Sequence, residues 1–369
     1  MYKKSILAVF LIMLLLLAGC NVSRETSVED RQIQTKSVVN KPVRNAELKQ
    51  ASNKVLEPAQ KAQEKVIEST DSEPKSEKPV ATKSDPEETA QVHLLVTRDY
   101  GEAMIFNQWV QVQEQQDALS LTTSYLDVKT SYGGSFVNSI NGLESGYTGK
   151  IGKREKSDWF LYFNGLLAGK GAGDIKVKRG DVVWWDYHDW GSSTFTPAMI
   201  GAFPHPFTNG VVLAYSASAQ NAADLLATGL GSRGIEKVQL QKVNDAILNK
   251  RHCPVIVLGL RGEIIAIPAI QALNSNPQRT GLFCSFTDSG FKLLNAAMQE
   301  EQIVEGGDYA CIEATASGMG DTNPLWLAVA EDERGLERAV SYLNQGKVNP
   351  DCGWGVVLGP QGLTPLPPR

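Results

Sequence analysis

The chain has 369 residues, of which 42% are hydrophobic, 21% charged and 8% aromatic. This average composition excludes a collagen-like, a wholly disordered and a multi-spanning membrane protein. The formal net charge is −5, and phosphate recognition calls for a basic surface, so no nucleic-acid partner is expected. The length is sufficient for two ordinary domains plus additional segments.

The N-terminus carries the features of a secretory signal. Two lysines precede an apolar run over residues 6–18, which is too short for a mature transmembrane helix but suits a signal peptide. The run ends in Leu17-Ala18-Gly19-Cys20, which resembles the lipobox of bacterial lipoproteins. That resemblance implies a lipoprotein signal peptide over residues 1–19, lipidation of Cys20 with palmitate-type chains, and anchoring at the extracytoplasmic face of the cell membrane. The alternative is an uncleaved signal anchor with a chance cysteine.

A polar segment follows the predicted anchor. Residues 21–90 contain no aromatic residue, 12 Lys or Arg, 13 Asp or Glu, and five scattered prolines. Such a segment buries too little apolar area to offset the entropy lost on ordering. We therefore expect residues 20–90 to be a disordered, lipid-anchored linker that acts as a spacer.

A first folded domain is predicted over residues 91–192. Its expected order of strands and one helix is typical of a small α+β, β-grasp-like fold, with a mixed sheet crossed by the helix. Asp117 is the expected N-cap of that helix. The predicted strands are 93–97, 104–113, Phe136–Ile140, Asp158–Phe163 and Asp181–Tyr187, and the predicted helix is Ala118–Val128.

Two of these strands carry a recognisable motif. Residues 158–165 read DWFLYFNG, and residues 180–187 read GDVVWWDY after a glycine-rich stretch. This pair resembles a bacterial surface domain that is similar to the C-terminal domain of transcobalamin and intrinsic factor. The resemblance covers about residues 91–192 and implies a corrinoid ligand, cobalamin, bound beside aromatic side chains.

The ligand-binding candidates come from this motif. Alternation along a strand places Trp184 and Asp186 on one face and Trp185 and Tyr187 on the other. Exposed aromatic faces suit a flat apolar ligand with a polar rim, whereas any single tryptophan has about even odds of belonging to the core. The candidates are Trp159, Tyr162, Asn164, Trp184, Trp185, Tyr187 and Trp190.

Two histidines are candidate axial ligands of cobalt. Asp186, His188 and Gly191 spell D-x-H-x-x-G, which resembles the pattern of cobalamin-dependent mutases and methyltransferases, where the Asp fixes the tautomer of the ligating His. The plain alternative is a turn with a solvated His188. His205 lies between two prolines in an aromatic connector, residues 191–206, whose stiffness predicts that the two folded parts pack together.

A second folded domain is predicted over residues 206–369. Unalternated apolar strands interleaved with helices indicate an α/β layered domain with a buried sheet. The predicted strands are Val211–Tyr215, Pro254–Leu260, Ile264–Pro268, Thr280–Phe286, Asp308–Ala314, Leu325–Ala330 and Gly355–Leu358, and the predicted helices are Ser218–Ala227, Asp288–Gln302 and Asp332–Leu343.

Glycines and cysteines of this part offer weaker signals. Residues 229–234 spell G-x-G-x-x-G after a helix, where a C-cap and turn are favoured over nucleotide binding. Residues 314–321 are either a ligand loop or a turn. The four later cysteines form no C-x-x-C pair, so buried thiols are favoured and one disulfide is the main rival. They are Cys253, Cys284, Cys311 and Cys352.

Together these features predict a binding protein and not an enzyme. No nucleophile elbow or metalloprotease motif occurs in the sequence, and no cofactor is expected to be required. The leading hypothesis is capture of a corrinoid for uptake by a membrane vitamin transporter. A structural or adhesive surface protein that binds a wall polymer or a protein is the alternative, and a hydrolase in the second domain is a third.

Overall fold

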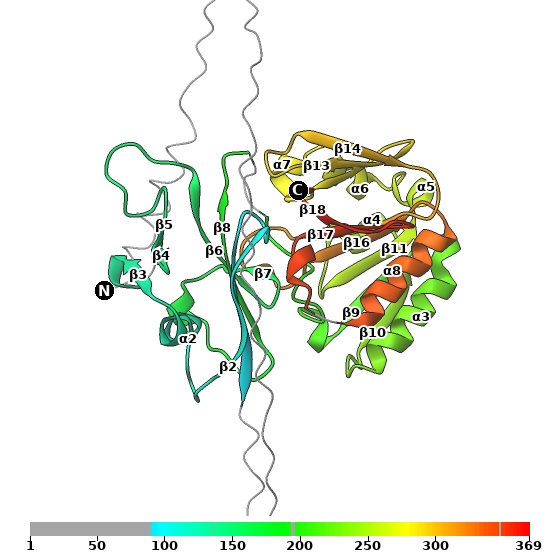
Figure 1. Ribbon diagram of the computed structural model, residues 1–369. Coiled ribbons are helices and arrows are strands. Elements are labelled where there is room, and N and C mark those ends of the chain that lie inside the picture. The colour runs from blue at the N-terminus through cyan, green and yellow to red at the C-terminus, as the bar shows by residue number, and fades with distance from the viewer. Residues whose placement is uncertain (1–89, 135, 193–195, 347) are drawn as a thin grey trace, which may run out of the picture. The chain divides into compact units, whose positions relative to one another are not determined.

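The computed structural model describes residues 90–134, 136–192, 196–346 and 348–369 (Figure 1). These residues form a mixed α/β fold with sheets of five, seven, three and three strands, which agrees with the predicted fold class. The predicted signal peptide, Cys20 and nearly all of the predicted linker 20–90 lie outside the described residues. Among the residues described, no helix combines the length and apolarity needed to cross a bilayer.

Residues 90–192, which we call the β-region, are built on a five-stranded sheet in the order β2-β1-β8-β6-β7. β1 pairs parallel with β8, and the other neighbours run antiparallel, so the sheet is mixed as predicted. β6 and β8 are the two strands that carry the motif. The strands are β1 (Gln91–Arg98), β2 (Ala103–Gln111), β6 (Ser157–Phe163), β7 (Leu166–Leu167) and β8 (Val182–Asp189).

One face of the five-stranded sheet is covered by a helix and a small sheet (Figure 1). The Asp117 side chain accepts a hydrogen bond from Ser120 N and caps the helix as predicted. The predicted end at Val128 is wrong, because the backbone becomes extended at Leu126 and the β-branched Val128 begins a strand. These elements are α2 (Ala118–Tyr125), β3 (Val128–Ser131), β4 (Phe136–Ile140) and β5 (Leu143–Glu144).

Residues 196–369, which we call the α/β-region, contain a seven-stranded sheet in the order β10-β9-β11-β16-β15-β17-β18. The first four strands are parallel and the last three are added antiparallel. Three of the strands, β15, β16 and β17, are buried throughout, and β9 and β11 are buried except for one half-buried residue at the end of each. This burial explains why their apolar sequences do not alternate with polar residues. The strands are β9 (Val211–Tyr215), β10 (Val238–Lys242), β11 (Val255–Leu260), β15 (Ala310–Thr315), β16 (Leu325–Ala330), β17 (Gly355–Gly359) and β18 (Gly362–Leu366).

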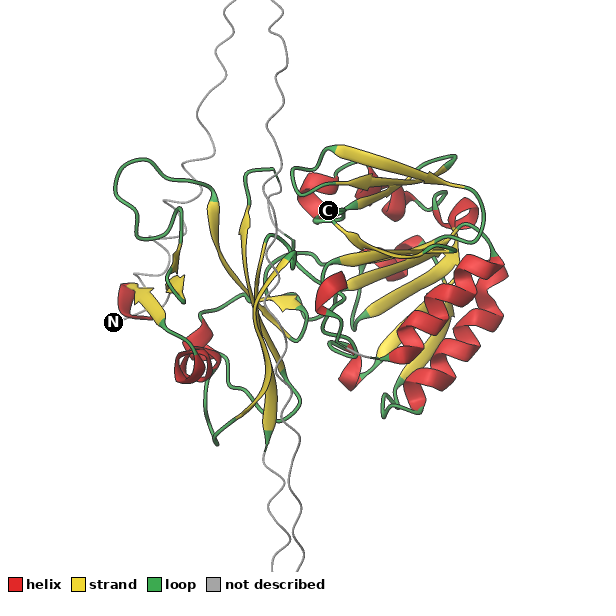
Figure 2. Ribbon diagram, viewed as in Figure 1, coloured by secondary structure: helices red, strands yellow, loops and turns green. Residues whose placement is uncertain are grey.

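Two long helices, α3 (Gln220–Gly231) and α8 (Glu333–Gln345), cover one face of this sheet (Figure 2). Asp332 caps α8 by accepting from Gly335 N at 2.9 Å, and α8 corresponds to the predicted helix Asp332–Leu343. The G-x-G-x-x-G segment lies where α3 ends, and Gly234 has a φ of 83°. The favoured interpretation of that segment, a helix end and a turn, is therefore correct.

The opposite face carries short helices and a three-stranded sheet in the order β12-β13-β14. The helices are α4 (Asp245–Asn249), α5 (Arg261–Ile264), α6 (Pro268–Asn274) and α7 (Pro277–Thr280), and the strands are β12 (Cys284–Phe286), β13 (Gly290–Leu294) and β14 (Glu300–Glu305). Five short 3₁₀ turns complete the described residues: Tyr132–Gly134, Ala172–Asp174, Phe207–Asn209, Ala217–Ala219 and Pro350–Cys352.

Two predictions in this layer are wrong. The predicted helix Asp288–Gln302 is instead the hairpin of β13 and β14, in which the two strands pair antiparallel and Asn295 accepts hydrogen bonds from two backbone N–H groups in the turn. The predicted strand Ile264–Pro268 is the junction of α5 and α6. Pro268 lies in the first turn of α6, where its missing N–H group costs nothing.

The two regions share one hydrophobic core, as the stiff connector predicts. Trp184 of the β-region and Trp354 of the α/β-region lie in it with ring centroids 5.8 Å apart. Within the α/β-region, the N–H groups of Ile200 and Gly201 both donate to Gly353 O at 2.8 Å. The two regions approach closely at Gly201, because a Cβ there would lie 2.8 Å from the Trp184 ring as well as from Gly353 Cα. The second face of the five-stranded sheet is thus covered.

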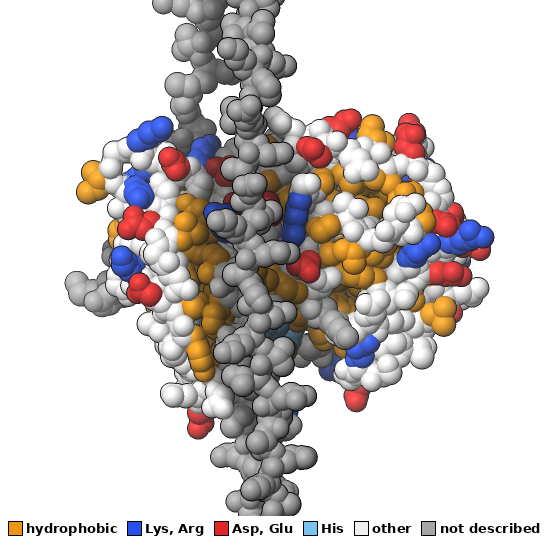
Figure 3. Space-filling model, in the orientation of Figure 1, with side chains coloured by type: hydrophobic (Ala, Val, Ile, Leu, Met, Phe, Trp, Pro, Cys, Tyr) orange, Lys and Arg blue, Asp and Glu red, His pale blue; other side chains and the backbone are white. Residues whose placement is uncertain are grey.

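The four later cysteines are free thiols. Cys284, Cys311 and Cys352 are buried and Cys253 is half-buried, in agreement with the favoured interpretation. Figure 3 shows hydrophobic side chains gathered in one band over the β-region and another over the α/β-region.

Candidate functional site

Four of the predicted ligand-binding aromatics lie inside the cores. Trp159, Tyr162, Trp184 and Trp185 are 7%, 0%, 0% and 4% exposed. Their polar atoms are satisfied internally: the indole N–H groups of Trp184 and Trp185 donate to the hydroxyls of Thr97 and Thr122, at 2.8 and 3.0 Å. The other two donate to backbone carbonyls at 3.1 and 3.0 Å. In this arrangement these four side chains hold the sheet together and present no face to a surface ligand.

The remaining three candidates differ in role. Asn164 adopts a φ of 52° in the turn between β6 and β7, where its side-chain oxygen accepts from Val182 N at 2.8 Å. Its amide donates to Asp181 Oδ1 at 3.0 Å, so it fixes the turn to β8. Tyr187 and Trp190 are half-buried, and of the seven candidates they are the aromatics that a surface ligand can reach.

His188 is a core residue with a carboxylate partner. Its Nδ1 lies 2.7 Å from Asp186 Oδ2, and its ring is stacked between Tyr100 and Phe160 with both centroid distances 4.2 Å. Only 3% of the residue is exposed. The aspartate therefore sets the tautomer as the motif implies, but aromatic rings cover both faces of the imidazole and leave only its edge for a ligand.

His205 serves the connector. Its Nε2 lies 3.0 Å from Gly180 O, and because a carbonyl only accepts, Nε2 carries the proton in this contact. The bond ties the connector to the turn before β8. The other ring nitrogen, Nδ1, is the one available to a metal.

Aromatic side chains that sequence analysis did not single out lie on the surface of the hairpin formed by β3 and β4. Tyr132 is 72% exposed and Phe136 is 55% exposed, and their rings meet edge to face with centroids 5.7 Å apart. We call them the hairpin pair. Tyr132 has a φ of 53° and Gly133 a φ of 70°. A bulky residue rarely adopts a positive φ, so Tyr132 occupies an unusual backbone conformation for its type.

A second aromatic pair joins Tyr147, on the loop after β5, to the half-buried Trp190, which directly follows β8. The rings of Tyr147 and Trp190 meet edge to face with centroids 5.2 Å apart. Arg154 lies over the Tyr147 ring at 5.0 Å, and Lys156 lies over the Trp190 ring at 5.7 Å. We call Tyr147 and Trp190 the loop pair. Cation–π contacts of this kind orient the rings while leaving them at the surface.

A small polar recess of about 160 Å³ lies among β3, β4, β5 and the loop that follows β5. Because its lining residues come from β3, β4, β5 and the loop that follows, the recess adjoins the strands of the hairpin pair and the loop of Tyr147. Its lining includes amide, hydroxyl and charged groups. These residues are Lys129, Asn138, Ser139, Glu144, Ser145, Thr148, Gly149 and Lys150.

We take the hairpin pair, the loop pair and this recess together as the candidate ligand-binding surface.

Residues 116–189, about a fifth of the chain, match a family model described as "Domain of unknown function (DUF4430)". The match runs from the start of α2 to the end of β8 and contains nearly all of the candidate surface. No curated protein matches the chain in sequence.

Two solved structures resemble part of the chain. A candidate metal-binding protein from Ruminococcus gnavus is 12% identical with a TM-score of 0.21, and the match covers 27% of this chain and 97% of that protein. Haptocorrin in complex with Cbi is 15% identical with a TM-score of 0.21, and the match covers 28% of this chain and 26% of haptocorrin.

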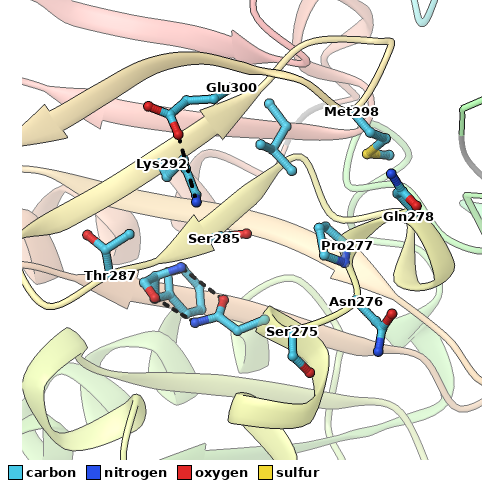
Figure 4. Close-up of a pocket in the computed structure, with 12 residues that line it drawn as sticks. Ser275, Asn276, Pro277, Gln278, Ser285, Thr287, Lys292, Met298 and Glu300 are labelled. Carbon is cyan, nitrogen blue, oxygen red and sulfur yellow. Dashed lines mark hydrogen bonds and ion pairs between the residues drawn. The ribbon is translucent and has the colours of Figure 1, made fainter. Parts of the chain in front are cut away.

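The α/β-region holds a separate cavity of about 540 Å³ between α6, α7 and the β12-β13-β14 sheet. Lys292 and Glu300 form an ion pair at 3.8 Å on its sheet side, and Ser275 and Asn276 line it from the helices (Figure 4). Ser285 lies between these two sides in the close-up (Figure 4). The cavity is therefore lined mainly by amides, hydroxyls and one ion pair.

The sequence contained a usable signal for the hairpin pair. Tyr132-Gly133-Gly134 separates two short stretches with β-branched residues, which predicts a tight turn with an aromatic residue at its tip. The loop pair had a weaker signal, because Tyr147 and Trp190 are distant in sequence and meet only when β6 pairs with β8.

Proposed function

We propose that this protein is an extracytoplasmic binding protein, anchored through lipidated Cys20, that captures a corrinoid and passes it to a membrane vitamin transporter. It acts without catalysis in this role and needs no resident cofactor. The observation that carries the proposal is the exposure of the hairpin pair, since two large aromatic side chains at 72% and 55% exposure have no partner within the described residues that would bury them.

The candidate surface suits a flat ligand with a polar rim. Exposed aromatic rings gain free energy by covering an apolar face, and Tyr and Trp combine that with a polar tip. The recess supplies the complementary polar groups, because Asn138, Ser145 and Lys150 offer donors and acceptors. A corrin ring with its amide side chains has this combination of a flat body and hydrogen-bonding rim. The motif in β6 and β8 supports the same ligand class.

The position of the buried tryptophans changes which residues we assign to binding. Trp184 and Trp185 stabilise the sheet on which the surface is built, whereas Tyr132, Phe136, Tyr147 and Trp190 offer accessible rings. Loss of a core tryptophan would therefore abolish folding and binding together, and loss of a surface aromatic would affect binding alone.

Titration of the full-length protein in detergent with cyanocobalamin tests the proposal. We expect saturable heat and a change in the visible spectrum of the ligand. Absence of both at roughly 50 μM ligand, with circular dichroism showing folded protein, would contradict corrinoid capture. Binding that is unchanged when both Tyr132 and Phe136 are replaced by Ala would place the ligand elsewhere.

A second candidate function is binding of a wall polymer, and the polar cavity of the α/β-region favours it. Its lining by Asn276, Ser285 and Lys292 suits a hydroxyl- and amide-rich chain, such as a wall saccharide. Co-sedimentation of the protein with purified cell wall tests this function. The variant Ser285→Leu should then reduce sedimentation while cyanocobalamin binding is retained.

A further inference from the structure

Three donor side chains meet between the two sheets of the α/β-region. Cys311 and Glu313 are alternate residues of β15, so both point to the same face of the seven-stranded sheet. Cys284 comes from β12 in the facing three-stranded sheet. One donor atom of each residue lies within 4.8 Å of the other two. The three residues are separated by up to 29 positions in sequence and meet only in the folded chain.

Backbone N–H groups position the carboxylate of Glu313, and one of its two oxygens has no hydrogen-bond partner among the described residues. Its Oε2 accepts hydrogen bonds from Phe283 N and Cys284 N, both at 3.1 Å. Its Oε1 is buried and has no hydrogen-bond partner among the described residues. A buried polar atom without a partner costs free energy, so this oxygen can accept a further partner without giving up a hydrogen bond.

We propose that Cys284, Cys311 and Glu313 bind a thiophilic divalent metal ion, of which Zn²⁺ is the representative, at a site separate from the candidate ligand-binding surface. The ligand set decides the class of ion. Two sulfur donors and one oxygen donor suit Zn²⁺ and its analogues, whereas Ca²⁺ and Mg²⁺ take oxygen ligands. Three protein ligands leave one coordination position of a tetrahedral ion for a small exogenous ligand.

The geometry requires little movement. Zinc bonds to sulfur and oxygen are about 2.3 and 2.0 Å, which places tetrahedral donors roughly 3.5–3.8 Å apart. Donors that now lie within 4.8 Å of one another therefore need to approach by roughly 1 Å at most. The two backbone N–H groups on Oε2 fix the position of the carboxylate, which is how outer-shell hydrogen bonds orient a metal ligand.

The charge of the ligand set favours a cation, and a dication offsets two of its three negative charges. Two thiolates and a carboxylate together carry three negative charges in a site where all three residues are at most 1% exposed. On binding, the thiol protons and the carboxyl proton pass to solvent and the metal replaces them. The ion would connect β12 to β15 and so fasten the three-stranded sheet to the seven-stranded sheet.

Metal analysis of the full-length protein tests the proposal. After dialysis against Zn²⁺ and removal of free ion, we expect one equivalent of zinc and a higher Tm than for chelator-treated protein. Replacement by Co²⁺ should produce thiolate-to-cobalt absorption bands in the near ultraviolet. Glu313→Gln should weaken Co²⁺ binding by at least about tenfold, and Cys284→Ser or Cys311→Ser should abolish the bands.

Cys352→Ser is the matched control, because Cys352 is a fully buried thiol outside this cluster. It should keep both the zinc equivalent and the cobalt bands. The proposal is overturned if folded wild-type protein binds neither ion, if the bands survive in the Cys284→Ser/Cys311→Ser double variant, or if mass spectrometry of protein purified without reductant finds a Cys284–Cys311 disulfide. Failure of cyanocobalamin binding has no bearing on these outcomes.

Discussion

The Nδ1 atom of His188 lies 2.7 Å from Oδ2 of Asp186, two residues earlier on the same face of β8. The same carboxylate also accepts from the hydroxyl of Thr97 and, at 3.2 Å each, from the N–H groups of Tyr100 and Gly101. Asp186 is fully buried. It therefore joins β8 to the turn after β1, in the core that the two regions share.

Asp186→Ala should be strongly destabilising. The substitution leaves one imidazole, one hydroxyl and two backbone N–H groups buried without their acceptor, and loss of a buried charged partner typically costs about 3–5 kcal/mol. Urea unfolding of the full-length protein measures the change. Asp174→Ala is the control, since Asp174 is exposed in a short turn of the same region; an equal effect of the two substitutions would contradict the assigned role.

The hairpin pair should contribute to binding and not to folding. Tyr132→Ala and Phe136→Ala should each weaken cyanocobalamin binding by about 2- to 13-fold, which corresponds to about 0.5–1.5 kcal/mol for an aromatic contact. The Tm should stay unchanged, because both side chains are exposed. Calorimetric titration gives the affinities. Leu225→Ala, an exposed apolar residue of α3 that is 62% exposed, should leave binding unaltered.

The metal-free protein should lose stability as the pH rises. Burial raises the pKa of Glu313 to about 8 from a usual value of 4.5, and the thiols that face it, Cys284 and Cys311, also have raised pKa values because of burial. Between pH 4.5 and about pH 8, the Glu313 carboxyl group keeps its proton in the folded chain and has lost it in the unfolded chain. The free energy of unfolding therefore falls between about pH 4.5 and pH 8, by an amount on the order of 5 kcal/mol at most.

Urea unfolding of chelator-treated protein at about pH 5, 6.5 and 8 measures this dependence. Glu313→Gln should flatten the curve over that range, because glutamine does not titrate. A wild-type curve that is already flat would show that Glu313 ionises at its usual pKa.

Gly201→Ala should disrupt the packing between the two regions. An added Cβ would lie 2.8 Å from Gly353 Cα and 2.8 Å from the Trp184 ring, and neither a backbone nor a buried indole moves easily. We expect destabilisation of about 1–3 kcal/mol. Gly173→Ala tests the same change in an open position, where nothing lies within 4 Å of an added Cβ. Equal thermal midpoints for the two variants would contradict the close approach.

Several elements followed directly from the sequence. The two motif strands became β6 and β8, the expected cap Asp117 begins α2, and the predicted helix Asp332–Leu343 became α8. In each case the signal is local: an alternation of apolar residues, or an oxygen that accepts from an N–H group three residues later. The hairpin of β13 and β14 was mistaken for a helix, because short apolar runs fit both periods.

The sequence also determined that Trp184 and Trp185 point to opposite faces of their strand, because a strand alternates its side chains. Only the tertiary structure decided that both faces are covered. Trp185 packs beneath α2, and Trp184 packs against Trp354, which lies 170 positions later in the chain. Burial depends on which distant elements pack together, and a local sequence pattern carries no information about that pairing. For this reason the sequence did not reveal that Tyr132 is exposed or that Cys284 lies near Glu313.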